Sequence, residues 1–470
     1  TSVTIPGSVN NMGTSAFSYC TSLTSAVMEN GVTSIGNSAF QSCIALASVA
    51  VPGSVATIGN SAFAGCSAVA SVTIGSGITS IGTYAFSTCN NLITVVIPGS
   101  VVIFGSGAFS GCANLTSVTI EDGVTTIGGS AFSYCTSLTS VTIPGSVTTI
   151  SASAFQMCSA LSSITIPNGV TTIGNYAFRY CSNLTSVTIP GSVNSIGTSA
   201  FSPCAALTEI NVDESNENYA SVGGVLYNKT GQLLIQCPAG KSGELIIPSG
   251  VTTIGIHAFY SSTLTSMTLP SSVTTIGTFV FYGCVNMTMM VMHGDAPTVG
   301  SSWNSGSDKL VIYYHKNATG FSTPIWSDAW CYPLSFINGT VQDANGHAVA
   351  GATVTMPNGI SVLTGPDGNF TFNGVLPGTY NLTIEKDGYI ALVHEVEVEQ
   401  AEDAVMEPLS MSLAPTDPDP NDSDPTDPDP TDPKTNPKND DGPDIPLIAG
   451  AVAAIAAAIV AAVLIVRRRS

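Results

Sequence analysis

Charged side chains are scarce in this 470-residue chain, above all in its N-terminal part. Only 9% of the residues are Asp, Glu, Lys or Arg, although the formal net charge is -20. Residues 1–200 contain the acids Glu29, Glu121 and Asp122 and a single base, Arg179. Nucleic-acid binding needs basic side chains that neutralise phosphates. We therefore expect no nucleic-acid partner.

Motifs for catalysis and for metal binding are also missing. The five histidines are scattered, none belongs to an H-E-x-x-H motif, and no C-x-x-C occurs. Gly240-Lys241-Ser242 resembles the end of a phosphate-binding loop, but Ile235 stands where that loop needs a glycine. Carboxylates for paired acid–base chemistry are nearly absent from the first 200 residues. These absences predict a protein that is not an enzyme and that has no cofactor and no metal.

A 23-residue repeat is the strongest positive signal in the sequence. An Ala-Phe pair recurs nine times without a slip, and a cysteine follows each phenylalanine three residues later. The phenylalanines are Phe17, Phe40, Phe63, Phe86, Phe109, Phe132, Phe155, Phe178 and Phe201, and the cysteines run from Cys20 to Cys204. Such regular self-similarity predicts a solenoid whose units bury their apolar sides against one another.

Each repeat predicts two short strands and a turn. In segments such as 117–120, Val and Ile alternate with Ser and Thr, so one face is apolar and the other carries hydroxyls. A second extended piece, such as 147–150, follows a Pro-Gly corner. The segment around the Ala-Phe pair is predicted to form a tight helical turn. Coils about 4.8 Å apart would place each Phe on the next Phe.

The regularly spaced cysteines allow two interpretations. Neighbouring coils bring their Cα atoms within disulfide range, and an oxidising exterior favours disulfides. The side chains would lie parallel, however, so free thiols packed as small apolar groups are the preferred prediction. Cys237 and Cys331 lie outside this regular series and are candidates to pair with each other.

The repeat resembles the BspA-like leucine-rich repeats of microbial and protozoan surface proteins. The resemblance rests on L-x-x-V-x-I-P, V-T-x-I-G and A-F-x-x-C within one unit, and it covers residues 1–289. Residues 209–245 interrupt the register and resemble the island of many such proteins. Residues 290–334, which are rich in aromatic side chains, are expected to cap the open end of the solenoid.

Residues 335–413 predict a second domain of a different kind. Short alternating segments are joined by turns such as Asp367-Gly368 and Asp387-Gly388, which is typical of a β-sandwich. The segment resembles the carboxypeptidase regulatory-like domain, a prealbumin-type sandwich. That family is a non-catalytic accessory, so the resemblance implies no activity here. The predicted fold class is therefore mainly β.

The C-terminal residues predict a stalk and an anchor. Residues 414–444 are rich in Asp-Pro and lack apolar residues, which predicts a stiff, solvated linker. Residues 445–466 carry no charge and suit one bilayer crossing. Arg467, Arg468 and Arg469 follow in the short tail 467–470, so the N-terminal part should lie outside the cell. The chain begins at Thr1 in mid-repeat, so we expect a fragment or a mature form whose signal peptide lies upstream or has been removed.

Three functions fit this organisation. The first is adhesion, in which the solenoid of a membrane-anchored surface protein binds proteins or glycans of another cell or of the matrix. The second is a structural coat whose copies bind one another, and the third is binding to ice or to a crystal surface through rows of hydroxyls. The candidate ligand-binding residues are the outward strand residues and two island tyrosines: Ser117, Thr119, Ser140, Thr142, Ser163, Thr165, Ser186, Thr188, Tyr219 and Tyr227.

Overall fold

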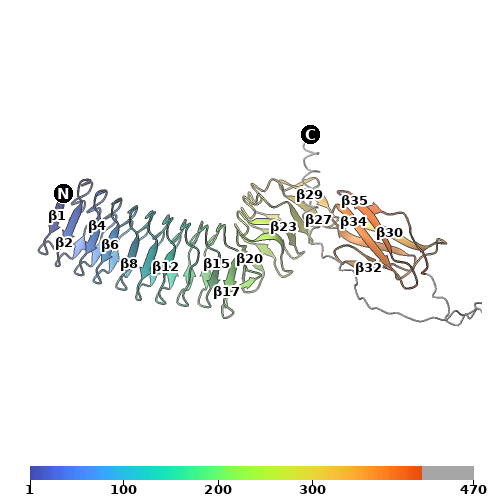
Figure 1. Ribbon diagram of the computed structural model, residues 1–470, viewed down its shortest axis with the longest axis horizontal. Helices are drawn as coiled ribbons and strands as arrows, with labels where there is room; N and C mark the ends of the chain where they lie inside the picture. Colours follow the sequence, from blue (N-terminus) through green and yellow to red (C-terminus); the bar gives the residue numbers. More distant parts are fainter. Residues whose placement is uncertain (415–470) are drawn as a thin grey trace, which may run out of the picture. The chain divides into compact units, whose positions relative to one another are not determined.

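The computed structural model describes residues 1–414 and divides into two compact units. The first unit is Thr1–Cys331 and the second begins at Tyr332. Figure 1 shows the strands of both units in chain order. No helix occurs among the described residues, so the fold is mainly β as predicted.

The first unit is a β-solenoid in which nearly every coil contributes one longer strand to a parallel row. Consecutive coils pair in register, as in Ser117↔Ser140 and Val118↔Val141. The apolar residue of each pair points inward because strand side chains alternate between faces. The longer strands are β1 (Ser2–Ile5), β2 (Ser25–Met28), β4 (Ser48–Val51), β6 (Ser71–Ile74), β8 (Thr94–Ile97), β10 (Ser117–Ile120), β12 (Ser140–Thr142), β15 (Ser186–Ile189) and β17 (Glu209–Val212).

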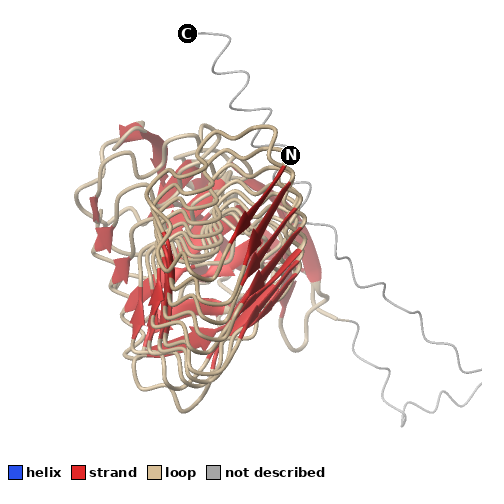
Figure 2. Cartoon of the chain, turned by 90° about the vertical axis from the view of Figure 1, so that its left-hand side faces the viewer, coloured by secondary structure: helices blue, strands red, loops and turns tan. Residues whose placement is uncertain are grey.

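A second row of two-residue strands runs along the other side of the coils. Figure 2, which looks along the stack, shows the two rows facing each other across the coil interior. Before the island this row is β3 (Ser34–Ile35), β5 (Thr57–Ile58), β7 (Ser80–Ile81), β9 (Ile103–Phe104), β11 (Thr126–Ile127), β13 (Thr149–Ile150), β14 (Thr172–Ile173) and β16 (Ser195–Ile196). In nearly every strand the second residue is a buried Ile.

The segment around the Ala-Phe pair is a series of tight turns, so the predicted helical turn is wrong. Backbone N–H groups alternate between two partners: Ala131 bonds Gly128 within its own coil, whereas Phe132 bonds Ala154 of the next coil at 2.8 Å. Ser130 and Tyr134 have φ of 53° and 60°. These left-handed residues turn every second N–H toward the neighbouring coil, which a helix would not allow.

Phenylalanine rings form a continuous stack through the core, as the spacing predicted. Their centroids are 5.0–5.7 Å apart from Phe17 to Phe201, and the planes are nearly parallel. Cys43 and the ladder cysteines after it are buried beside the rings as free thiols. Cys237 and Cys331 are free as well, so the suggested disulfide between them is wrong. Each sits in the packed core with no sulfur partner.

The island replaces one regular coil with an antiparallel meander. It contains β18 (Tyr219–Val222), β19 (Val225–Asn228) and β20 (Leu233–Gln236), and β20 then pairs in parallel with β22 (Thr253–Ile254). The Phe stack stops at Phe201 and restarts with Phe259 and Phe281, 5.1 Å apart. A second core cluster accordingly begins here.

The coils after the island continue to an aromatic end. Their strands are β21 (Ser242–Ile246), β23 (Thr263–Leu269), β24 (Thr275–Ile276), β25 (Met289–Met292), β26 (Thr298–Val299), β27 (Val311–Tyr314), β28 (Ile325–Trp326) and β29 (Ala329–Pro333). Trp303 and Trp326 are buried in contact with each other.

The second unit contains two sheets around one core. One sheet has the order β33-β30-β36 with β37 also paired to β30, and the other has the order β32-β31-β34-β35. Ile337, Val354 and Leu382 lie in the common core. The strands are β30 (Ser335–Asp343), β31 (Thr353–Thr355), β32 (Ser361–Leu363), β33 (Asn369–Val375), β34 (Gly378–Glu385), β35 (Leu392–Val398), β36 (Ala404–Val405) and β37 (Leu409–Met411).

The predicted linker and anchor lie almost entirely outside the described residues. Only residue 414 of the linker is described, and the predicted helix at 445–466 and the tail at 467–470 are not. Among residues 1–414, the structure has no helix of the length and hydropathy needed to cross a membrane.

Candidate ligand-binding face

Six of the eight predicted Ser and Thr contacts lie on the row of longer strands, and Ser163 and Thr165 lie in an unpaired segment between β12 and β15. Ser117 and Thr119 of β10 are half-buried, and the other six are exposed. Ser117 pairs with Ser140 and Thr119 with Thr142, so the structure brings these four together. At the far end, Ser186 and Thr188 of β15 pair with Glu209 and Asn211 of β17, where the hydroxyl rows end.

Hydroxyls on this face differ sharply in what they contact. The threonine just before each strand is occupied: Thr139 Oγ1 donates to the Thr116 carbonyl at 3.1 Å, and Thr116 Oγ1 donates to the Ile93 carbonyl at 3.1 Å. The eight predicted strand hydroxyls form no side-chain hydrogen bond within the described residues. They are consequently available to an external ligand.

A groove of about 450 Å³ crosses the face where the strand row opens. Residues 163–166 keep the Ser-Ile-Thr-Ile pattern but pair with neither β12 nor β15. Ser163, Thr165, Ser186 and Thr188 line the groove, and Asp213 stands at its edge. Half of the predicted hydroxyls therefore share one concave surface.

The residue before each strand correlates with where the row opens in seven of nine coils. Four threonines at this position donate their hydroxyl to a carbonyl of the preceding coil, and the strand after each of them pairs with the strand of that coil. They are Thr24, Thr116, Thr139 and Thr208. Coils with Ala47, Ile93 or Ser162 at this position have no strand paired to the coil before. Two coils depart from this rule. The strand after Ala70 pairs with the preceding coil although alanine has no hydroxyl. The strand after Thr185 does not pair with the preceding coil, although Thr185 Oγ1 donates to the Ser162 carbonyl at 3.4 Å. At Ser162 the hydroxyl bond to the preceding coil is absent, and residues 163–166 lie unpaired beside β12.

Asp213 is the only charged residue among those that line the groove. The Ser215 hydroxyl and backbone N–H both donate to Asp213 Oδ1, at 2.5 and 2.9 Å. These hydrogen bonds lower the pKa of Asp213, with the hydroxyl contributing more. Asp213 is therefore ionised at neutral pH and can accept hydrogen bonds from ligand hydroxyls.

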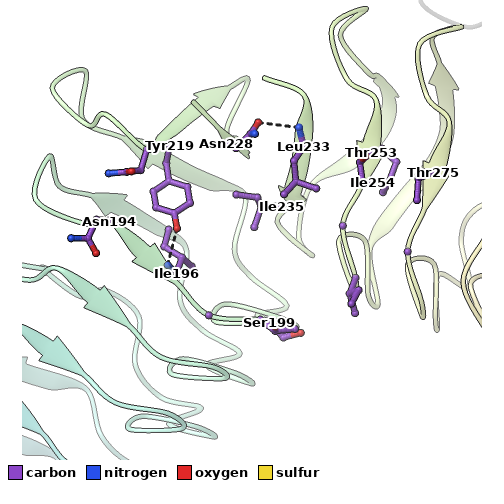
Figure 3. Close-up of a pocket in the computed structure, with 16 residues that line it drawn as sticks. Asn194, Ile196, Ser199, Tyr219, Asn228, Leu233, Ile235, Thr253, Ile254 and Thr275 are labelled. Atoms are coloured by element: carbon purple, nitrogen blue, oxygen red, sulfur yellow. Dashed lines mark hydrogen bonds between the residues drawn. The ribbon is translucent and has the colours of Figure 1, made fainter. Parts of the chain in front are cut away.

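A second cavity of about 670 Å³ lies where the island joins the solenoid. Figure 3 shows Tyr219 reaching from the island toward Ile196, with Asn228 and Leu233 beside it and Thr253 and Thr275 on the other side. Tyr219 Oη accepts a hydrogen bond from the Ile196 N–H at 2.9 Å, and burial raises the pKa of Tyr219. Tyr219 thus lines a cavity, as a ligand-contacting residue must.

Tyr227, by contrast, is only 2% exposed and packs in the core of the second cluster. Burial raises the pKa of Tyr227 strongly, with a smaller contribution from Cys237. No face of its ring is open to a ligand, so its prediction as a binding residue is corrected. β19 is covered on both sides, because Val225, Leu226 and Tyr227 are all buried.

The asparagines around the second cavity were not among the predicted residues. Asn194, Asn218 and Asn228 line it, and Asn228 Oδ1 accepts a bond from the Leu233 N–H at 2.9 Å. The repeat pattern of the sequence could have identified Asn194. It stands where the two preceding coils have Thr148 and Thr171, whose hydroxyls bond the adjacent coil.

Comparison with known proteins agrees with this geometry. The model of the BspA type leucine rich repeat region matches residues 1–116, 102–222 and 239–322, in six copies. The carboxypeptidase regulatory-like domain matches residues 337–410. No curated protein matches the chain.

Two bacterial structures are similar to the chain. A leucine-rich repeat protein from Bacteroides ovatus is 25% identical with a TM-score of 0.55, and the match covers 71% of this chain and 92% of that one. One from Eubacterium ventriosum is 30% identical with a TM-score of 0.44, covering 48% of this chain and 61% of that one. Because the repeat model spans more than half of the sequence and each matched stretch lies within the solenoid, the chain belongs to the family of BspA-type leucine-rich repeat proteins.

Proposed function

We propose that this protein is a non-enzymatic cell-surface protein that binds a glycan or protein of another cell, or of the matrix, through the hydroxyl face of its solenoid. The observation that carries the proposal is the groove of about 450 Å³ lined by Ser163, Thr165, Ser186 and Thr188. Its hydroxyls are not engaged within the described residues, so a ligand need not break existing bonds to reach them.

The chemistry of the groove favours a hydroxyl-rich ligand. Hydroxyls both donate and accept, and the adjacent Asp213 carboxylate accepts only. Ile164, which is half-buried, supplies apolar surface beside these polar groups. A groove of this size suits one or two sugar rings. Contacts repeated on successive coils can also add up along an extended ligand.

The uneven face argues against binding to ice or to a crystal surface. That function needs a continuous hydroxyl lattice, whereas Val27, Ala50 and Val96 replace threonine on the same row. The row also opens at residues 163–166. An interrupted surface with a groove suits a discrete ligand better.

Surface display is the second part of the proposal. Its support is the resemblance to surface proteins and the uncharged segment 445–466, followed by three arginines. Deleting residues 445–470 should release the protein from the membrane fraction into the medium. Recovery of the deleted form in the membrane pellet would contradict anchoring by this segment.

Binding is tested with cells that display the full chain. They should adhere to a subset of surfaces on an array of neutral glycans and matrix proteins, while cells with an empty vector do not. Adhesion should be lost when soluble protein lacking residues 445–470 is added as a competitor without detergent. Equal adhesion of both cell lines to every surface would contradict the proposed function.

A further inference from the structure

Arg179 lies in an aromatic cluster on the turns of the solenoid, away from the hydroxyl face. Its guanidinium carbon is 4.9 Å from the ring centroid of Tyr180, 5.1 Å from Tyr176 and 5.8 Å from Tyr260. Guanidinium groups are attracted to aromatic faces at these distances. Three tyrosines from two separate coils thus hold one cation in place.

The hydrogen-bonding capacity of Arg179 is unused. Within the described residues its side chain forms no hydrogen bond and no ion pair, and its Nε is buried without a partner. A guanidinium has five N–H donors, and leaving a buried one unpaired is unfavourable. Arg179 is also the only Lys or Arg among residues 1–200. A basic side chain at this position is therefore an exception to the composition of that stretch.

The island creates the space in which this cluster forms. The coil after Phe201 lacks an Ala-Phe turn, and Ser199 Oγ reaches across to His257 Nδ1 at 2.9 Å. In the coil next to Arg179, the equivalent residue is Ser202, which is small and buried. Arg179 can therefore extend over Ser202 to Tyr260 of the coil beyond.

More rings extend the cluster along the following coils. Tyr260 stacks on Tyr282 at 5.1 Å, and His257 stacks on Phe279 at 5.7 Å. Tyr282 is 41% exposed, so the ring surface is open to solvent. Burial, and to a lesser extent the charge of Arg179, lowers the pKa of His257, which stays neutral at pH 7. The cluster therefore combines one fixed cation with an open aromatic surface.

We propose that Arg179, with Tyr176, Tyr180 and Tyr260, binds the carboxylate of an acidic sugar. A guanidinium fork matches a carboxylate in a bidentate pair, and the rings beside it offer apolar faces against which a sugar ring packs. A carboxylate would satisfy donors that the protein leaves unpaired. The site is independent of the hydroxyl face and of the function proposed for it.

A purely structural role makes a different prediction. If Arg179 served only as a clamp between the coils on either side of the island, its replacement would lower thermal stability and the protein would bind no acidic sugar. The two roles are separated by measuring binding and unfolding on the same variants.

Full-length protein in detergent should be titrated with methyl glucuronide and, as the matched neutral probe, methyl glucoside. Wild type should bind the glucuronide at least about 10-fold more tightly than the glucoside, and salt should weaken the binding. Arg179→Gln should lose that preference, whereas Arg179→Lys should keep part of it because the charge remains. If Arg179→Gln does not fold, Arg179→Lys still tests the proposal, because it should keep part of the preference for glucuronide over glucoside.

Three results would overturn the proposal. They are equal affinity of wild type for both probes, unchanged glucuronide binding by a folded Arg179→Gln, and no detectable binding of glucuronide by wild type. Gln156 occupies the position of Arg179 one coil earlier and is likewise half-buried. Gln156→Ala is therefore a matched control that should leave the preference for glucuronide unchanged.

Discussion

The Cys135 thiol donates a hydrogen bond to the Phe109 carbonyl oxygen of the preceding coil, 3.2 Å away. The same relationship recurs at Cys43, Cys66, Cys89, Cys112, Cys158, Cys181 and Cys204, with distances of 3.1 to 3.4 Å. Near the end of the solenoid, Ser307 Oγ makes the equivalent bond to the Phe281 carbonyl at 2.6 Å. The ladder cysteines are therefore hydrogen-bond donors as well as packing groups.

Replacing Cys135 separates these two roles. Cys135→Ala removes packed volume and the donor, and we expect a loss of about 1–2 kcal/mol in unfolding free energy. Cys135→Ser keeps a donor, as Ser307 does, and should lose less. Urea denaturation monitored by circular dichroism measures both. Equal losses for the two variants would show that the hydrogen bond contributes nothing.

Thiol reactivity should distinguish Cys20 from all other cysteines. Cys20 is exposed, and the remaining eleven are buried. A neutral alkylating reagent should modify Cys20 within minutes in the native protein and the others only after unfolding, because a buried thiol is inert. Mass spectrometry of peptides from native and denatured samples gives the counts. Disulfide-blocked cysteines in the denatured, unreduced sample would contradict the free-thiol ladder.

Stability should fall at alkaline pH. Burial raises the pKa of Cys66 and of Cys112 to about 12, above the ordinary thiol value of about 8.5. The folded state thus favours the neutral thiols. Their contribution is complete below the unfolded value and is lost as pH rises toward 12. Urea midpoints from pH 8 to pH 11 should decline, and less steeply in a Cys66→Ala/Cys112→Ala variant; parallel curves would contradict this assignment.

Closing the groove tests its structural origin. Ser162→Thr should restore the hydroxyl bond to the Thr139 carbonyl, as Thr139 makes to Thr116. Strand pairing at residues 163–166 should follow, with greater protection of their amides in hydrogen exchange and weaker ligand binding. Ser162→Ala is the matched control and should change neither. Unaltered exchange in the threonine variant would mean that another feature opens the row.

The sequence predicted the regular part of the fold and much less of its exceptions. A Phe every 23 residues specifies the ring stack, because identical coils place identical side chains above one another. The turn was misjudged since Ser130 and Tyr134 are not glycines and give no sign of their positive φ. The groove lies beside a segment that follows Ser162 in place of threonine, and a difference of one methyl group gave no sign of a groove in the sequence.

In the candidate site, too, the regular features were predictable from the sequence and the exceptions were not. The outward Ser and Thr rows were predictable from strand alternation. Tyr227 was not, because its burial depends on how the island folds over β19. The Arg179 cluster joins residues more than 80 positions apart in the sequence, since Tyr260 and Arg179 meet only through the shortened island coil.

The most direct measurement compares ligand affinity after the same four substitutions on the two strand rows. One full-length variant changes Thr119, Thr142, Thr165 and Thr188 to Lys, and its control changes Thr57, Thr126, Thr149 and Thr172 to Lys on the row of two-residue strands. Both add four charges at partly or fully exposed positions. We predict at least about a 10-fold loss of affinity for the first variant, equal to about 1.4 kcal/mol, and little change for the control. Equal affinity of both folded variants and the parent for the bound ligand would contradict a binding role for the hydroxyl face.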